Sequence, residues 1–274
     1  MIRRSRQFPL PSIWAAALAG FSVAVLSATA QAATLLPDFT GVWSTYVEAG
    51  GKAPPGGGGR RSTAPLPFTP EGKRRNDEYK QLLGPEQANS GAYCVDYGMP
   101  MMMEMAGGYP LEFIQKGDQL TIIFEVEGET RRVFLGKRGV PEEKRIPSRQ
   151  GYSVGHWEAK TLVVETGDLL DGEDQFHPHS DQAHITERFA LGTDAKGVKF
   201  MSYSMSLTDP VYYTAPVTVD RKFAFVPDGF LFTYRCPDEF WLNLLKARRE
   251  QLHAGKPADA KMSDVYKAWE ETQK

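Results

Sequence analysis

The feature that most constrains the fold is a long succession of short β-type segments separated by turns. From Pro110 onward, runs rich in β-branched and aromatic residues alternate with Gly, Pro and Asp residues that favour turns. One earlier run, before Pro110, has the same composition. The ten predicted strands are Phe39–Val47, Leu111–Gln115, Leu120–Val126, Thr130–Leu135, Tyr152–Trp157, Thr161–Thr166, Ala183–Leu191, Val198–Leu207, Val217–Val226 and Phe230–Cys236.

The links between these strands are mostly short, and helices do not alternate with them. A parallel, doubly wound sheet is therefore disfavoured. A sequential antiparallel meander of this size is expected to close, because closure removes its unpaired edges. We predict a mainly β fold: an antiparallel, lipocalin-like barrel of about 8–10 strands with C-terminal helices and interior room for a small ligand.

The first 32 residues differ from the rest of the 274-residue chain, since their only charged residues are three arginines. A 14-residue apolar run, Ile13–Leu26, precedes the small residues of Ala30-Gln31-Ala32. This pattern predicts a signal peptide over residues 1–32 and a periplasmic or secreted protein without a membrane anchor after cleavage. Without this signal peptide the chain has 29 basic and 34 acidic residues, a net charge of −5. Nucleic acid is therefore not an expected partner.

The remaining residues, 33–274, are predicted to form a single barrel domain. Residues 48–67, rich in Gly and Pro, are expected to be a flexible insertion. Thr69 is expected to cap a helix over Glu71–Leu83, and residues 237–272 to hold two helices, Pro237–His253 and Asp264–Thr272. Residues 85–109 are expected to be irregular. Their methionines either fill the core or line a ligand mouth: Met99, Met101, Met102, Met103 and Met105.

Cys94 and Cys236 are the two cysteines of the chain. An exported protein meets an oxidising compartment, which favours a disulfide between them. The alternative is that the fold keeps the two thiols apart.

Three of the five histidines lie in one short segment, His177, His179 and His184, with Asp181 among them. This spacing leaves two interpretations open, a metal site or a polar loop with hydrogen-bonded histidines. Pro178 between the first two favours a loop over a central strand. We expect no metal or other cofactor, and keep His177, His179 and His184 as the alternative ligand set.

The strand that follows this segment has a polar face. Strand alternation places His184 and Arg188 on one side and Glu187 on the other. These charges either line a wet cavity or form surface pairs across neighbouring strands. Within a cavity, the candidate partners are Glu112, Arg131 or Arg132, and His156.

Several segments resemble a family of exported bacterial proteins without an assigned activity. The resemblance rests on Asp38–Trp43, Pro110–Ile114, Gly155–Glu158 with Thr161–Thr166, Pro178–Ser180 and His184–Phe189. The chain departs from this family at Ala159-Lys160, where Gly-Asp is usual, and near Val140-Pro141, where a histidine is usual. Gly41-Val42-Trp43 also resembles the first-strand signature of lipocalins, which implies a small-molecule barrel.

These observations give one leading functional hypothesis. The barrel binds a small, partly apolar organic molecule and catalyses proton transfer as a lyase, isomerase or hydratase does. The expected catalytic residues are His179, His184, Arg188, Glu112 and Glu187. The expected ligand-binding residues are Trp43, Tyr152, His156, Trp157 and Arg132. A carrier without chemistry, a His-ligated metalloenzyme and a non-catalytic envelope protein remain alternatives.

Overall fold

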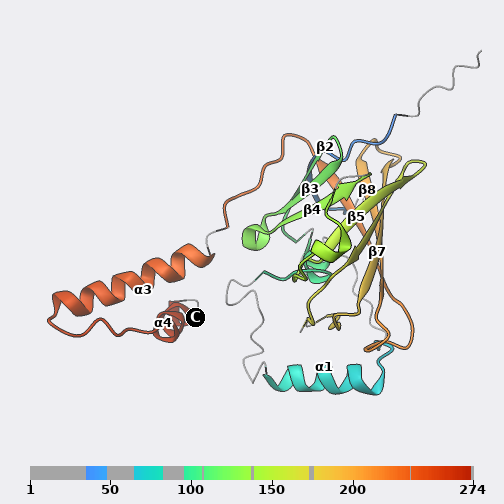
Figure 1. Cartoon of the computed structure of the whole chain (residues 1–274). Coiled ribbons are helices and arrows are strands. Elements are labelled where there is room, and N and C mark those ends of the chain that lie inside the picture. Colours follow the sequence, from blue (N-terminus) through green and yellow to red (C-terminus); the bar gives the residue numbers. More distant parts are fainter. Residues whose placement is uncertain are drawn as a thin grey trace, which may run out of the picture. The chain divides into compact units, whose positions relative to one another are not determined.

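Nine strands close into one barrel in the computed structural model, which describes residues 35–47, 65–82, 96–106, 108–136, 139–172, 176–234 and 236–272 (Figure 1). The prediction of a mainly β barrel with C-terminal helices is confirmed. The strands are β1 (Gly41–Thr45), β2 (Leu111–Lys116), β3 (Gln119–Phe124), β4 (Thr130–Leu135), β5 (Tyr152–Glu158), β6 (Thr161–Gly167), β7 (His184–Thr193), β8 (Lys199–Thr208) and β9 (Val217–Val226).

Each strand follows its neighbour in sequence around the barrel, and β9 pairs with β1 to complete it. All pairs are antiparallel except β4 and β5, which run parallel. The chain must therefore return to the starting end of β4 before β5 begins, since a tight turn cannot join parallel strands. The connecting segment contains a short 3-10 helix, η3 (Glu142–Lys144). The expectation of a wholly antiparallel barrel is corrected at this one pair.

The predicted tenth strand, Phe230–Cys236, is wrong. Residues 229–234 have no regular structure, and Phe230 and Phe232 are exposed. Because β9 is already paired on one side with β8 and on the other with β1, the closed sheet offers this segment no free edge. A β-type composition alone does not make a strand where no partner is available.

Alternating side chains fill the barrel interior. In β8, for example, Met201, Tyr203, Met205 and Leu207 are all buried, while the residues between them are more exposed. Near one end an aromatic cluster forms, in which Phe39 packs against Phe113, Trp157 and Phe189 with ring centroids 5.9–6.3 Å apart. The interior at this level is a packed core.

Within the described ranges the barrel is accompanied by four α-helices: α1 (Pro70–Leu82), α2 (Met101–Met105), α3 (Cys236–His253) and α4 (Met262–Thr272). Helix α2 lies in the stretch expected to be irregular, and the buried methionines Met99, Met101, Met102 and Met103 show that this run serves as core. Helices α3 and α4 contact each other, and Arg248 Nε donates to the carbonyl oxygen of Ala260 at 3.0 Å.

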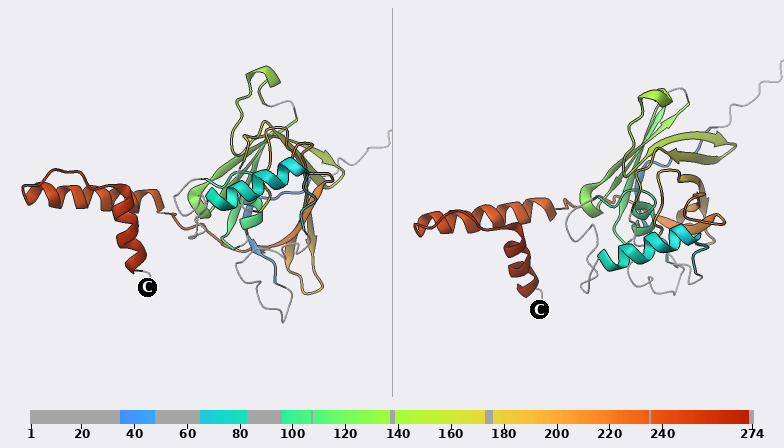
Figure 2. Two further views of the ribbon diagram at one scale, coloured as in Figure 1. Left: turned by 90° about the horizontal axis from the view of Figure 1, so that it is seen from below. Right: turned by 60° about the horizontal axis from the view of Figure 1, so that its bottom comes forward.

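Helix α1 crosses one end of the barrel (Figure 2). Thr69 caps it, because its Oγ1 accepts the backbone N–H of Gly72 at 3.0 Å. Gly72 also allows a close approach to the β8–β9 connection: a Cβ at this position would lie 2.2 Å from the carbonyl oxygen of Tyr212. Arg75 Nε donates to the Tyr212 hydroxyl at 3.0 Å and fixes the helix further. We name this part of the molecule the α1 end.

Several sequence expectations lie outside the described residues: the signal peptide, most of the insertion over 48–67, and Cys94. The Cys94–Cys236 disulfide therefore stays a prediction. Among the helices in the described ranges, none combines the length and the apolar character that a membrane crossing requires.

Candidate functional site

The barrel interior holds a buried ion pair between Arg131 of β4 and Glu187 of β7. Arg131 Nη1 donates to Glu187 Oε1 at 2.9 Å, and Arg131 Nη2 contacts Glu187 Oε2. Ser153 and Thr166 accept further bonds from the guanidinium, at 2.9–3.2 Å. The Tyr203 hydroxyl donates to Glu187 Oε1 at 3.0 Å. The polar groups of this pair are thus well satisfied, as buried charges require.

Tyr203 is buried beside this ion pair. Burial, together with the nearby Glu187 carboxylate, raises the pKa of Tyr203 well above that of a free phenol. Glu187 lies on the inner face of β7, as the alternation pattern allowed. Its partners are Arg131 and Tyr203, and it contacts none of the candidate histidines.

The opposite face of β7 is on the outside of the barrel. His184 Nε2 lies 2.6 Å from Glu165 Oε2, and Arg188 Nη2 donates to Glu158 Oε2 at 2.5 Å. His156 lies 3.5 Å from the same Glu158 carboxylate. These three candidates are half exposed and form pairs across neighbouring strands. Of the two interpretations of this face, surface pairing is the one the structure adopts.

The other candidates from the sequence are scattered. Arg132 is exposed on β4, and Glu112 is half-buried between two inward-facing residues of β2. The Tyr152 hydroxyl accepts the backbone N–H of Val140 at 2.6 Å. Trp43 is fully buried and donates through Nε1 to the carbonyl oxygen of Phe39 at 2.9 Å, while Trp157 stacks on Phe39. These side chains do not converge on one cavity with the histidines.

The histidine loop between β6 and β7 lies at the α1 end. His177 Nδ1 contacts Glu104 Oε1 of α2, and both residues are buried. His179 is also buried, and its Nδ1 lies 3.2 Å from the carbonyl oxygen of His177. The loop is held by Asp209, whose carboxylate accepts both the backbone N–H and the hydroxyl of Ser180 at 2.6 and 2.9 Å.

This arrangement separates the three histidines of the alternative metal set. His177 pairs with Glu104, His184 with Glu165, and His179 faces the loop backbone. Within the described residues, no group of three His, Cys, Asp or Glu side chains has the geometry to hold a metal ion. Asp181 is exposed.

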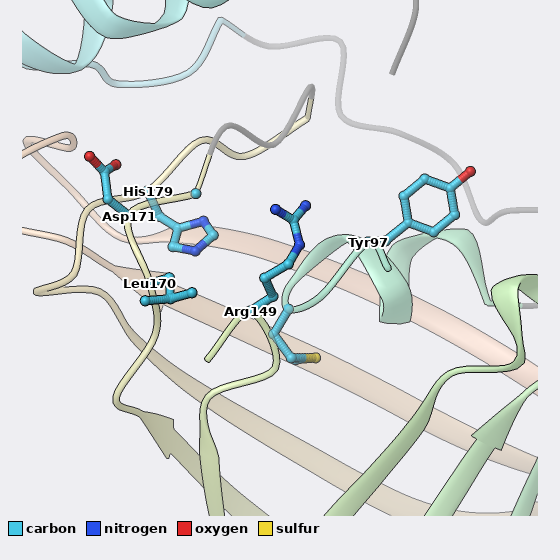
Figure 3. Close-up of a pocket in the computed structure, with 7 residues that line it drawn as sticks. Tyr97, Arg149, Leu170, Asp171 and His179 are labelled. Atoms are coloured by element: carbon cyan, nitrogen blue, oxygen red, sulfur yellow. The ribbon is translucent and has the colours of Figure 1, made fainter. Parts of the chain in front are cut away.

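A pocket with a volume of about 50 Å³ opens beside His179 (Figure 3). Arg149 and Tyr97 form its other polar walls, and Figure 3 shows Arg149 between Tyr97 and His179. Asp171 is already paired: it accepts from Arg75 Nη2 and from the Tyr212 hydroxyl, each at 3.0 Å. The full lining is Tyr97, Met99, Arg149, Leu170, Asp171, Gly172 and His179.

Gly172 sets the position of the His179 ring. The two residues exchange backbone hydrogen bonds of 2.8 and 3.1 Å. A Cβ on Gly172 would lie 2.3 Å from His179 Cε1 and 2.6 Å from Nε2. Because Gly172 has no side chain, the imidazole of His179 can pack directly against the backbone at Gly172.

Arg149 also holds the wall that carries Tyr97 and Met99. Its Nε donates to the carbonyl oxygen of Asp96 at 2.8 Å, and its own carbonyl oxygen accepts the backbone N–H of Met99 at 2.9 Å. Below this wall, the buried Glu129 carboxylate accepts the backbone N–H groups of Tyr97 and Gly98.

Two carboxyl groups near this wall have raised pKa values. Burial raises the pKa of Glu129 to about 7, against the lowering effect of the Tyr97 N–H, and the nearby Asp96 raises it further. Burial likewise raises the pKa of Glu127 to about 7, against the lowering effect of its hydrogen bond with Tyr234. Both groups therefore titrate close to neutral pH.

Of the residues that line this pocket, the sequence pointed to His179 and, as one alternative for the methionines, to Met99. The other charged residues in and beside the pocket lie in connections between strands, where no periodic pattern predicts which residues contact each other. They are Arg149, Asp171, Glu127 and Glu129. Glu104 had a usable signal, because a single acid within a run of buried methionines needs a partner.

The chain matches no protein-family model, and neither the curated proteins nor the solved structures include one that is significantly similar to it.

Proposed function

We propose that the protein binds a small organic anion with a partly apolar body in the pocket at the α1 end, and that His179 supplies acid/base chemistry there, of the lyase, isomerase or hydratase type. The observation that carries this assignment is that Arg149 and His179 line one pocket together with the apolar groups of Met99 and Leu170. A cation, an imidazole and apolar walls are the features expected of a site for such a ligand.

The charge balance of the pocket favours an anion. The negative charge of Asp171 is compensated by Arg75 of α1. Arg149 uses Nε for the Asp96 carbonyl, and its two terminal nitrogens have no hydrogen-bond partner among the described residues. A planar guanidinium is well suited to a carboxylate, which it can bind through two parallel hydrogen bonds.

The surroundings of His179 favour a proton acceptor at Nε2. Nδ1 lies next to a carbonyl oxygen, which only an N–H can satisfy. In the neutral ring the lone pair is then on Nε2, which can take a proton from a bound molecule. The pairing of His177 with Glu104 stabilises the loop from which His179 projects.

The first experiment measures binding of matched acid and amide probes. Acetate, butyrate and benzoate are titrated into the 15N-labelled protein, beside acetamide, butyramide and benzamide. We expect the acids to shift the backbone resonances of Tyr97, Met99 and Gly172, and the neutral amides to have much weaker effects. Arg149→Ala should weaken acid binding at least tenfold, whereas Arg249→Ala, on exposed α3, should not change it. Equal binding of acids and amides would contradict the assignment.

The carrier without chemistry is the second candidate. It is favoured by the surface pairing of His184, His156 and Arg188, which leaves His179 as the one candidate base from the sequence that lines the pocket. The enzyme and the carrier differ in whether the protein speeds the exchange of an acidic C–H proton of a bound molecule. If His179 is a catalytic base, a probe with an acidic α-proton exchanges it for deuterium faster with the wild type than with His179→Ala. A carrier gives binding and equal exchange rates.

The N-terminal sequence supports a proposal about where the protein is located. We propose export through the signal over residues 1–32, so that the working protein begins at Ala33 and meets small molecules outside the cytoplasm. Mass spectrometry of protein purified from the periplasm and medium of an expressing cell should give a chain starting at Ala33. A full-length cytoplasmic product would contradict export.

A further inference from the structure

We infer that Glu129 is a proton-responsive anchor for the pocket wall, ordering Tyr97 and Met99 when it is ionised and loosening them when it is protonated. This inference rests on the proposed pocket for its functional meaning, but its physical basis lies in a separate set of contacts beneath that pocket.

The geometry of the anchor is simple. Glu129 precedes β4 and is 3% exposed. One carboxylate oxygen accepts the N–H of Tyr97, and the other accepts the N–H of Gly98, 3.4 Å away. Tyr97 and Met99 are both pocket residues, and Gly98 lies between them. One buried carboxylate therefore holds the chain at the centre of this wall.

Ionisation decides how many of these bonds can form. A carboxylate is an acceptor at both oxygens, whereas a carboxylic acid has a donor at one of them. On protonation, one of the two N–H groups of the wall faces a hydroxyl group and loses its charge-assisted bond. The wall then keeps its contacts with Arg149, through Asp96 and Met99, but loses part of the support beneath it.

The groups around Glu129 place this change near neutral pH. Asp96 and Glu127 are acidic neighbours, and both disfavour a further negative charge on Glu129. Glu127 lies near Tyr97 and Tyr234, and the rings of Tyr109 and Tyr234 meet edge to face at 6.3 Å. A cation, Arg149, also contacts the wall, where it donates to the backbone oxygen of Asp96. Burial raises the pKa of Glu129 most, and the two acidic neighbours add to it, so this carboxyl group stays protonated to a higher pH than a free one.

The first test needs no ligand. The 15N and amide proton shifts of Tyr97 and Gly98 are followed from pH 5 to 9, together with the side-chain carboxyl carbon of Glu129. We expect a common midpoint near pH 7. In Glu129→Gln the amide transition should disappear, and in Glu143→Gln, a change at an exposed site in η3, it should remain. Amide shifts that do not change across this range, or that titrate unchanged in Glu129→Gln, would overturn the inference.

The second test connects the anchor to the pocket. Benzoate affinity is measured for wild type and Glu129→Gln at pH 6 and pH 8.5. The ratio of the two affinities at each pH isolates Glu129, because it is the one side chain in which the two proteins differ. We expect Glu129→Gln to bind benzoate about five- to tenfold more weakly than wild type at pH 8.5, on the order of one charge-assisted hydrogen bond, and within about twofold at pH 6.

The outcomes separate the two proposals. If neither protein binds acetate, butyrate or benzoate while the amide transition behaves as expected, the proposed ligand class is wrong and the anchor stands. If benzoate binds but the affinity ratio is the same at both pH values, the anchor does not control the pocket. If Glu129→Gln fails to fold, the wild-type amide and carboxyl titrations still decide whether the wall responds to Glu129.

Discussion

Arg131 and Glu187 form an ion pair across the barrel interior, and neither residue is exposed by more than 1%. The two residues come from β4 and β7, which do not pair directly in the sheet. Their bond therefore links two strands that are separated in the sheet by β5 and β6, and Ser153, Thr166 and Tyr203 complete the set of hydrogen bonds around it.

Breaking this pair should strongly destabilise the protein. Glu187→Ala leaves the guanidinium of Arg131 buried without its counter-charge, and a loss of about 3–5 kcal/mol in the free energy of unfolding is expected. Urea unfolding followed by tryptophan fluorescence measures it. The double change Arg131→Met with Glu187→Leu should recover most of the loss, because apolar side chains carry no desolvation penalty.

The matched surface pair should behave differently. Arg188 and Glu158 are about half exposed, and water screens their attraction. Arg188→Ala should leave the urea midpoint almost unchanged in the same assay. A loss as large as that of Glu187→Ala would mean that the outer face of β7 has a role in stability that its exposure does not suggest.

Stability should fall as the pH rises through neutrality. The pKa values of Glu127 and Glu129 are about 7 in the folded protein and near 4.5 when unfolded. Folding therefore favours the protonated acids, so their contribution is complete below pH 4.5 and is lost as the pH rises through about 7. We expect the free energy of unfolding at pH 8.5 to be lower than at pH 5.5 by on the order of 2 kcal/mol, a figure that allows for solvent screening at the partly exposed Glu127.

The double variant Glu127→Gln with Glu129→Gln provides the control for this pH dependence. Neutral amides do not titrate, so urea midpoints of the double variant should vary less with pH than those of wild type. A pH dependence identical to that of the wild type would assign the effect to other groups.

Phe39→Ala should open a cavity in the aromatic cluster. Phe39 is fully buried and contacts Phe113, Trp157 and Phe189. We expect a loss of about 3–5 kcal/mol in the free energy of unfolding. An apolar cavity of this kind binds small apolar molecules, so benzene should raise the melting temperature of the variant more than that of wild type. Equal shifts in both proteins would show that the cluster collapses into the space.

Gly172→Ala should displace the His179 ring. The new methyl group would overlap Cε1 and Nε2, so the imidazole must turn away from its place in the pocket. The 1H and 13C shifts of the His179 ring should change, and acid binding should weaken at least fivefold. Gly167→Ala is the matched control, because its Cβ would lie 3.8 Å from the nearest atom, His184 Nδ1. If Gly172→Ala changes neither the chemical shifts of the His179 ring nor acid binding, the ring has more freedom than its contacts indicate.

The fold was largely predictable because strand formation depends on local patterns. Alternating side chains and turn residues gave the nine strands to within a few residues, and Thr130–Leu135 and Val217–Val226 match β4 and β9 at both ends. The error at Phe230–Cys236 arose because closure of the sheet is a property of all strands together. The parallel pairing of β4 and β5 likewise depends on the path of the connection between them.

The amino-acid sequence by itself determined the class of fold, since period-two alternation and frequent turns leave a closed β-sheet as the favoured solution. It also brought His179 forward as a chemical candidate. Only the tertiary structure decided that His184 and Arg188 face outward, that Glu187 pairs with Arg131, and that Arg149 lies beside His179. These relationships join residues far apart in the chain, where packing and charge compensation, rather than local pattern, select the partner.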